Sequence, residues 1–230
     1  MSIEERQREE KEQRRQSIID AAEQVLGEKP RGEVTMSDIA DTARLSRSLL
    51  YVYFEDMEDI FFAVTLRGFR ALRSAFEGAV AQHEVGLMKI RAIGEAYIRF
   101  AENEKVYFER VAQFESRAPA SVSDGSYYTQ CLSESDRVKR TMTEAIQAGI
   151  EDGSIREDLD PARTAVVLWG FTHGLIQLRA HKGSVLRERL RVDPDTLMDY
   201  ALDFAGVALS GHCEHPAPMS PSALQQSASE

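Results

Sequence analysis

Cysteine, proline and long apolar runs are scarce in this sequence, and each scarcity excludes a class of protein. The two cysteines, Cys131 and Cys213, lie far apart without a spacing pattern, which argues against a disulfide framework and fits reduced thiols. No apolar stretch reaches the ~20 residues of a membrane helix. The first residues, MSIEERQREEKEQRRQ, are charged where a secretory signal would be apolar. We therefore expect a cytoplasmic protein with no membrane partner.

The sequence also lacks an excess of basic residues. The 230 residues carry a formal net charge of -10, and residues 1–60 hold nine Lys or Arg against fifteen Asp or Glu. Positive charge is the usual electrostatic sign of a nucleic-acid partner, so composition alone argues against one. The sequence also contains no Gly-rich phosphate loop, no HExxH motif and no nucleophile elbow. We expect neither an enzyme nor a cofactor.

What the sequence does contain is helical periodicity. Apolar residues recur at 3.6-residue spacing in nearly every segment and almost never alternate, which predicts an all-α protein of about nine helices. Asp-Pro pairs at 160–161 and 193–194 mark two helix starts, because an acidic N-cap precedes a proline at the first helical position. The expected helices cover about 10–26, two short segments after Thr35 and after Ser46, 57 to near Gly86, 88–102, 105–117, 127–151, 161–182 and 194–209.

Three segments are expected to lie outside this helical framework. Residues 1–9 are read as a flexible charged arm, although Glu and Arg residues four apart could extend the first helix through it. Residues 117–126 form a loop rich in Pro, Ser and Gly, and 211–230 read as a disordered tail. The HCEH motif at 212–215 could bind a transition metal, but chance proximity in such a tail is the favoured interpretation, so no metal site is expected.

The segment around LSRSLLYVYF (45–54) carries the most chemistry. Thr35 with Asp38 predicts a capping box at the first short helix, and Ser46 predicts an N-cap for the second. Two short helices joined by a tight turn can brace one helix across a DNA backbone while the other enters the major groove. The alternative is that they are ordinary packing helices in an all-α protein, with their tyrosines in the core. The pattern alone leaves both interpretations open.

From about Arg14 to Leu72 the chain resembles the DNA-binding domain of the tetracycline-repressor (TetR) family of transcriptional regulators. The segments IIDAAEQVL, TMSDIADTARLSRSLLYVYF and EDMEDI carry the resemblance. It implies a DNA-binding domain over 10–56 with a helix-turn-helix motif at 35–54, and an effector-binding and dimerisation domain over 57–210. The resemblance assigns DNA contacts to Thr35, Ser37, Arg47, Ser48, Leu49, Tyr51, Val52 and Tyr53. The charge of Arg44 and the polar side chain of Ser46 make these two residues further candidates.

The sequence departs from the family pattern at two positions. Arg44 stands where the family usually has glycine, which puts a left-handed turn in question, and Met57 stands where a lysine commonly contacts phosphate. The four carboxylates of EDMED should also weaken DNA binding. We expect a modest number of cationic contacts, from Arg44, Arg47 and some of the basic residues in 6–15. These departures also motivate the alternative that the chain is a helical ligand-binding or scaffold protein that no longer binds DNA.

The last two long helices are the candidate dimer surface. Gly170 and Gly174 lie four apart, so they share a helix face that a partner helix can approach closely. The alternative is that both glycines pack inside one subunit. The segment GIEDGSIREDLDPARTAVVLWGFTHGL also resembles the end of TetR-family ligand domains, and this favours the dimer. The predicted interface comprises Trp169, Gly170, His173, Gly174, Gln177, Ala201, Phe204 and Ala205.

Many aromatic residues lie in the helices between 57 and 180, and most of them must be core. A subset could line an apolar cavity for a lipophilic or aromatic effector: Phe69, Tyr97, Phe100, Phe108, Phe114, Tyr128 and His173. Arg99, Glu115 and Arg117, with His173, are the polar candidates that could orient it. The resemblance implies a homodimeric regulator on the nucleoid, most often a repressor, that leaves a palindromic double-stranded operator when its effector binds.

Overall fold

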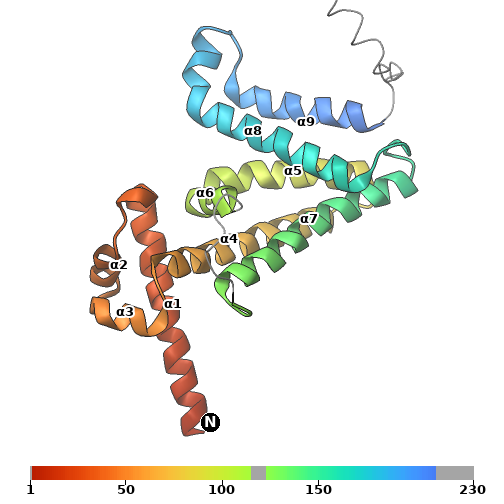
Figure 1. Cartoon of the computed structure of the whole chain (residues 1–230). Coiled ribbons are helices and arrows are strands. Elements are labelled where there is room, and N and C mark those ends of the chain that lie inside the picture. Colours follow the sequence, from red (N-terminus) through yellow and green to blue (C-terminus); the bar gives the residue numbers. More distant parts are fainter. Residues whose placement is uncertain (1, 115–122, 211–230) are drawn as a thin grey trace, which may run out of the picture.

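The computed structural model describes residues 2–114 and 123–210, and all of its regular structure within these ranges is helical (Figure 1). The predicted tail at 211–230, with its HCEH motif, and part of the predicted loop lie outside the described residues. A 3-10 turn, Arg31–Glu33, joins the first two helices. The nine α-helices of the described ranges are α1 (Ile3–Glu28), α2 (Met36–Ala43), α3 (Arg47–Tyr53), α4 (Met57–Val80), α5 (Gly86–Asn103), α6 (Lys105–Gln113), α7 (Tyr127–Glu151), α8 (Pro161–Glu188) and α9 (Pro194–Ser210).

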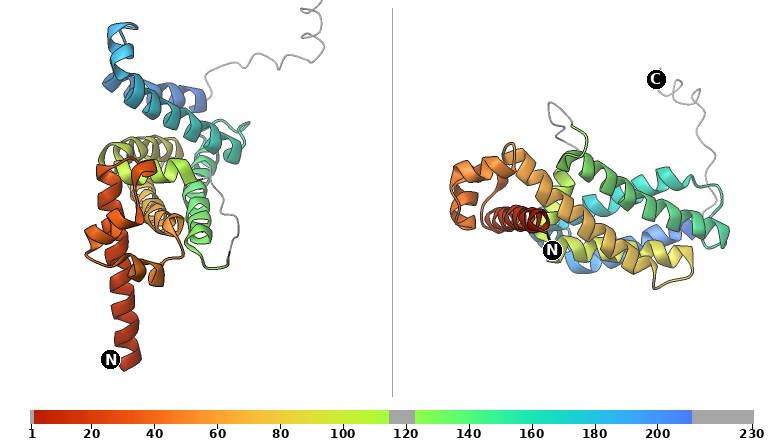
Figure 2. Two further views of the ribbon diagram at one scale, coloured as in Figure 1. Left: turned by 60° about the vertical axis from the view of Figure 1, so that its left-hand side comes forward. Right: turned by 90° about the horizontal axis from the view of Figure 1, so that it is seen from below.

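The helices form a small head and a larger body (Figure 1). Helices α1, α2 and α3 with the start of α4 make the head, and α5 to α9 with the rest of α4 make the body. Each part has its own hydrophobic core. Head core residues on α4 end at Val64, and body core residues begin at Leu66, so the border between the cores falls inside one continuous helix. The turned views in Figure 2 show the same separation of head and body.

The predicted arm at 1–9 is wrong, because α1 begins at Ile3. Ser2 and Glu5 form a capping box: the Ser2 hydroxyl accepts a hydrogen bond from the Glu5 amide at 3.1 Å, and the Glu5 carboxylate accepts one from the Ser2 amide at 2.6 Å. The sequence interpretation missed this cap because the stretch carries almost no apolar residues. All of 3–14 is exposed, and buried positions begin at Ile18.

Gly86 begins α5, although it was expected to end the preceding helix. A Cβ at this glycine would lie 2.1 Å from the Gly149 nitrogen and 2.2 Å from its Cα, so α5 meets the backbone of α7 directly. The Asp152 carboxylate accepts a hydrogen bond from the Gly86 amide at 2.7 Å, which fixes the contact. Only glycine can begin α5 at this crossing. Within the described ranges, no helix is long and apolar enough to cross a membrane.

Replacing Gly86 with alanine should destabilise the body, because the added methyl group meets backbone that cannot move aside. We expect Gly86→Ala to lower the free energy of unfolding by at least about 2 kcal/mol. Gly78→Ala is the matched control, since a Cβ there meets nothing within 4 Å, and it should raise stability by about 0.5–1 kcal/mol. Urea denaturation of both variants at one protein concentration measures the difference. Equal effects would contradict the close crossing.

Candidate DNA-binding face and effector cavity

Helix α2 is fixed at its start by the predicted capping box, which the structure confirms. The Thr35 hydroxyl accepts a hydrogen bond from the Asp38 amide at 3.2 Å, and the Asp38 carboxylate accepts one from the Thr35 amide at 2.9 Å. The Lys29 ammonium lies 2.6 Å from the same carboxylate. The hydrogen bond from Lys29 and those from Thr35 lower the pKa of Asp38 to about 2, so this carboxylate is charged at neutral pH.

The turn between α2 and α3 places Arg44 in the left-handed region, at φ 56° and ψ 44°. This conformation costs a residue with a Cβ roughly 1–2 kcal/mol. The Arg44 amide donates to the Asp41 carbonyl at 3.1 Å and the Leu45 amide to the Ala40 carbonyl at 2.9 Å, which closes α2. Arg44 stands in place of the family's usual glycine, and the backbone nevertheless adopts the left-handed conformation. The guanidinium is exposed and forms no ion pair with any described residue.

Helix α3 presents one polar face to solvent and one apolar face to the head core. Ser46 caps the helix, because its hydroxyl accepts a hydrogen bond from the Leu49 amide at 3.3 Å. Leu50 is fully buried and Phe54 is 2% exposed, whereas Val52 is 66% exposed. The other side chains predicted to contact DNA differ in exposure: Thr35, Arg47, Ser48 and Tyr51 are exposed, and Ser37, Leu49 and Tyr53 are half-buried. Tyr53 packs against the head core.

Most carboxylates of the acidic segment 55–59, at the start of α4, have local partners. Asp56 caps α4 by accepting from the Asp59 amide at 2.8 Å, and Asp59 accepts from the Glu55 amide at 3.3 Å. Burial raises the pKa of Asp59. Glu58 pairs with the Arg31 guanidinium through both carboxylate oxygens. The ion pair with Arg31 offsets one of the four carboxylate charges that the segment presents beside α3.

Two groups of contacts join the head to the body, and the sequence interpretation did not identify them. Arg67 on α4 donates to Asp20 at 2.7 Å and to Glu23 at 2.8 Å, both on α1. The Tyr107 hydroxyl on α6 donates to Glu23 at 3.0 Å. Desolvation and the carboxylate raise the pKa of Tyr107 to about 12, so the phenol keeps its proton. The ring of Tyr127, at the start of α7, stacks on Phe54 with centroids 5.9 Å apart.

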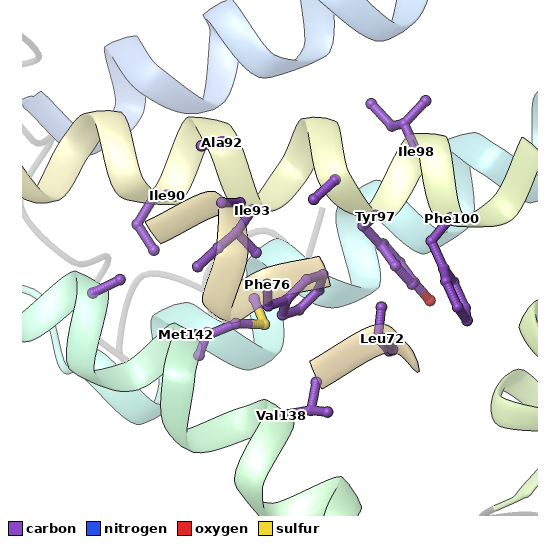
Figure 3. Packing of buried hydrophobic residues seen from close by; sticks show 14 of the residues in the cluster. Leu72, Phe76, Ile90, Ala92, Ile93, Tyr97, Ile98, Phe100, Val138 and Met142 are labelled. Atoms are coloured by element: carbon purple, nitrogen blue, oxygen red, sulfur yellow. The ribbon is translucent and has the colours of Figure 1, made fainter. Parts of the chain in front are cut away.

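Two of the cavities in the body share a wall. The larger, of about 410 Å³, lies between α5, α8 and α9, and the smaller, of about 80 Å³, lies among α4, α6, α7 and α8. Phe76, Tyr97, Met142 and Trp169 line both. Figure 3 shows Phe76 beside Met142 and the Tyr97 ring projecting from α5 into the core. The larger cavity falls within the ~300–1,000 Å³ of ordinary ligand pockets.

Tyr97 supplies the polar group in the shared wall. Its hydroxyl lies 2.9 Å from His173 Nδ1 and accepts a hydrogen bond from the Trp169 indole at 3.4 Å. Burial raises the pKa of Tyr97 to about 12, so the phenol stays protonated at neutral pH. Burial also lowers the pKa of His173, which favours neutral imidazole.

The predicted pocket residues are only partly brought to these cavities. Phe69 lines the smaller cavity and Tyr97 lines both. The remaining five residues pack in the protein interior and line neither of the two cavities: Phe100, Phe108, Phe114, Tyr128 and His173. They pack into ring clusters, with Phe108 against Tyr97 and His173, and Phe114 against Tyr128. Of the predicted polar candidates, Arg99 is exposed and lines neither cavity, and 115 and 117 lie outside the described residues.

Helices α8 and α9 expose an apolar face. Gly170 and Gly174 have nothing within 4 Å of a built Cβ, so they do not pack inside the chain. Ala201 was predicted to lie in the dimer interface, but it is only 5% exposed and packs within its own chain, so this assignment is wrong. His173, Gln177 and Ala205 are partly buried. The large exposed apolar side chains of the two helices are Val166, Val167, Trp169, Leu178, Val185, Tyr200, Phe204 and Val207.

Two family models match the chain. The model described as "Bacterial regulatory proteins, tetR family" matches residues 18–64, and the model described as "Tetracyclin repressor-like, C-terminal domain" matches residues 90–205. The first covers the head through the start of α4, and the second covers most of the body. No curated protein matches the sequence.

Solved structures share this fold at low sequence identity. A protein of unknown function from Rhodococcus sp. RHA1 is 21% identical, with a TM-score of 0.71 over 86% of this chain and 95% of that chain. The TetR family transcriptional regulator PfmR from Thermus thermophilus is 20% identical, with a TM-score of 0.62 over 86% and 99%. The regulator FadR from Bacillus subtilis, solved in complex with stearoyl-CoA, is 18% identical, with a TM-score of 0.63 over 84% and 98%.

Relieving the strain at Arg44 should stabilise the head. We expect Arg44→Asn to raise the free energy of unfolding by up to about 1 kcal/mol, because asparagine tolerates the left-handed conformation better than arginine. Arg47→Asn is the matched control, since it removes the same charge at an ordinary helical position, and it should not stabilise. Thermal or urea unfolding measures both. Stabilisation by both variants would point to charge rather than backbone strain.

Proposed function

The chain belongs to the TetR family of bacterial regulatory proteins, a family that binds operator DNA, dimerises and binds small-molecule ligands, and we propose that it is a homodimeric repressor. In this proposal it leaves a palindromic operator when a small lipophilic effector occupies the larger cavity. One observation carries the proposal: the single helix α4 is built into both the head, which exposes α3, and the body, which holds the cavity.

The exposed face of α3 suits the major groove. Arg47 is long enough to reach guanine or phosphate, Ser48 and Tyr51 offer hydroxyl groups, and the exposed methyl groups of Val52 can contact a thymine methyl. One α3 offers few base contacts, so specificity needs two heads spaced about one helical turn of DNA, ~34–36 Å, apart. The apolar face of α8 and α9 offers the surface for an isologous dimer that sets this spacing.

The proposed switch is a change in the spacing of the two heads. An effector among α5, α8 and α9 displaces the wall that Phe76 of α4 shares with the cavity, and α4 carries that displacement to the head. The effector must prefer the conformer with wrongly spaced heads. A hundredfold loss of operator affinity requires a hundredfold preference, about 2.8 kcal/mol.

The cavity rim suggests the effector's chemistry. Leu87, Met88 and Leu168 give the larger cavity an apolar lining, and Arg91 stands at its edge with Asp203, 2.5 Å away on α9. An amphipathic anion could bury an alkyl chain and place its carboxylate on Arg91, displacing Asp203. FadR, solved with stearoyl-CoA, offers an acyl ligand in a similar fold. We therefore favour an acyl-chain effector with a negatively charged end.

Dimerisation through α8 can be tested with Gly174→Leu. Because nothing in the chain lies within 4 Å of a Cβ at Gly174, the variant should fold normally yet lose close contact with a partner helix. We expect the dimer dissociation constant to rise by roughly tenfold or more, since overpacking costs about 1–3 kcal/mol. Sedimentation velocity and a mobility shift on the chain's own upstream DNA measure dimerisation and operator binding. Gly78→Leu, at an open site on α4, is the control. A Gly174→Leu protein that stayed dimeric would contradict this interface.

Effector chemistry can be tested with decanoate and decanol, which share one chain length and differ in charge. We expect decanoate to stabilise the protein more in a thermal shift assay and to release operator DNA. Arg91→Gln should remove the preference for decanoate and leave decanol binding unchanged. We expect the affinity for decanoate to fall roughly tenfold or more, because a charge-assisted contact is lost. Arg99→Gln, on the same helix but outside the cavity, is the control. An unchanged preference in Arg91→Gln would exclude the anionic end.

A further inference from the structure

The first four turns of α1 extend beyond the head as an exposed helix. Figure 1 and the left view of Figure 2 show α1 continuing past α3, with its N-terminus farther out than any other part of the head. Residues 3–14 are all exposed, and the first buried side chain of the helix is Ile18. The fifteen-residue step from Ile3 to Ile18 spans about 22 Å of helix, so this extension can reach well beyond α3.

Basic residues predominate on one face of this extension, and Glu4, one turn before Arg8, is the acid at the end of their row. Arg8, Lys11 and Arg15 follow one another at steps of three and four, and the same row continues into Ile18, Ala22 and Val25, which are buried in the head core. Glu5, Glu9 and Glu12 occupy a second row, which continues into Gln16, Asp20 and Glu23. This second row faces α4, because Arg67 bonds all three of its later members.

The two rows therefore face different parts of the molecule. The basic row shares its direction with the residues that face the head core, and beyond the core this direction leads to the space next to α3. The acidic row is directed toward α4. The rows adjoin along one edge, where Arg15 lies 3.3 Å from Glu12. Arg8 and Lys11 form no ion pair with the acidic row.

The cations of the basic row are available. Arg8, Lys11 and the flanking Arg14 are exposed and form no ion pair with any described residue, so the pairs expected between glutamate and arginine four apart, Glu4 with Arg8 and Glu10 with Arg14, are absent. Arg15 lies at the border: it is partly buried, bonds Glu12 at 3.3 Å, and has an unpartnered buried Nε.

We infer that the exposed cations of this row, Arg8 and Lys11, with the flanking Arg14, bind the phosphate backbone of the operator beside the groove that α3 enters. The inference builds on the proposed DNA binding and adds a second contact surface to it. The rise from residue 8 to residue 14 is about 9 Å, the length of two to three successive phosphates of one strand at ~3.4 Å of DNA axis each. The row can thus follow the phosphates at one edge of that groove. These residues place positive charge next to the DNA, although the chain as a whole has a net charge of -10.

Salt dependence tests the inference, because each phosphate contact contributes about 0.9 to the slope of log K against log salt. Wild-type protein and the double variant Arg8→Gln/Lys11→Gln are titrated against the same upstream DNA at several salt concentrations. We expect the variant to lower the slope by about 3 to 4, for two contacts in each of two subunits, and to weaken binding roughly tenfold or more at 0.1 M salt.

Arg6→Gln, compared with Arg8→Gln, is the matched control. The two substitutions remove the same charge two residues apart, on different faces of one exposed helix. Arg8→Gln should lower the slope, and Arg6→Gln should leave it near the wild-type value. Equal effects of the two single variants would show general electrostatics and overturn the inference, as would an unchanged slope in the double variant. If wild-type protein does not bind the DNA at all, the proposed function fails instead.

Discussion

The structure depends on one helix that two hydrophobic cores share. Ile60 and Val64 of α4 are fully buried in the head, while Leu66 and Leu72 are buried in the body. A continuous α-helix does not bend at such a border without a proline, a bulge or an inserted group, and α4 contains no proline. The head therefore follows the orientation of α4, and a rearrangement of the body core is also a rearrangement of the head.

Contacts from α6 and α7 reinforce this coupling. At Gly68 a Cβ would lie 3.1 Å from the Val111 side chain and 3.2 Å from that of Tyr107, so α6 is packed closely on α4 just below the border between the cores. Tyr107 then reaches Glu23 on α1, the same carboxylate that Arg67 bonds. Three body helices, α4, α6 and α7, thus contact the head. A signal from the body reaches the head through several joined contacts rather than one flexible link.

The features predicted well from the sequence are those fixed by neighbours along the chain. Thr35 with Asp38, and Ser46, act on amides three residues away, so their sequence pattern specifies their geometry. The cavity wall was predicted poorly, because it depends on which helices cross and where small residues leave space. Phe114 and Tyr128 have the same apolar character as Tyr97, yet they fill a ring cluster. No periodicity distinguishes an aromatic residue at a cavity from one in a core.

Net charge misled the interpretation for a related reason: it does not say where the charges lie or which of them are paired. In the head, Asp38 is paired with Lys29, Glu58 with Arg31, and Asp20 and Glu23 with Arg67. These acids stabilise the fold and present little free negative charge. The cations Arg44 and Arg47, by contrast, have no partner among the described residues. Phosphate binding depends on the unpaired charges within about a Debye length of the contact. Pairing within the chain removes charges of both signs and leaves the net charge unchanged, so an acidic chain binds phosphate only where its unpaired cations lie together.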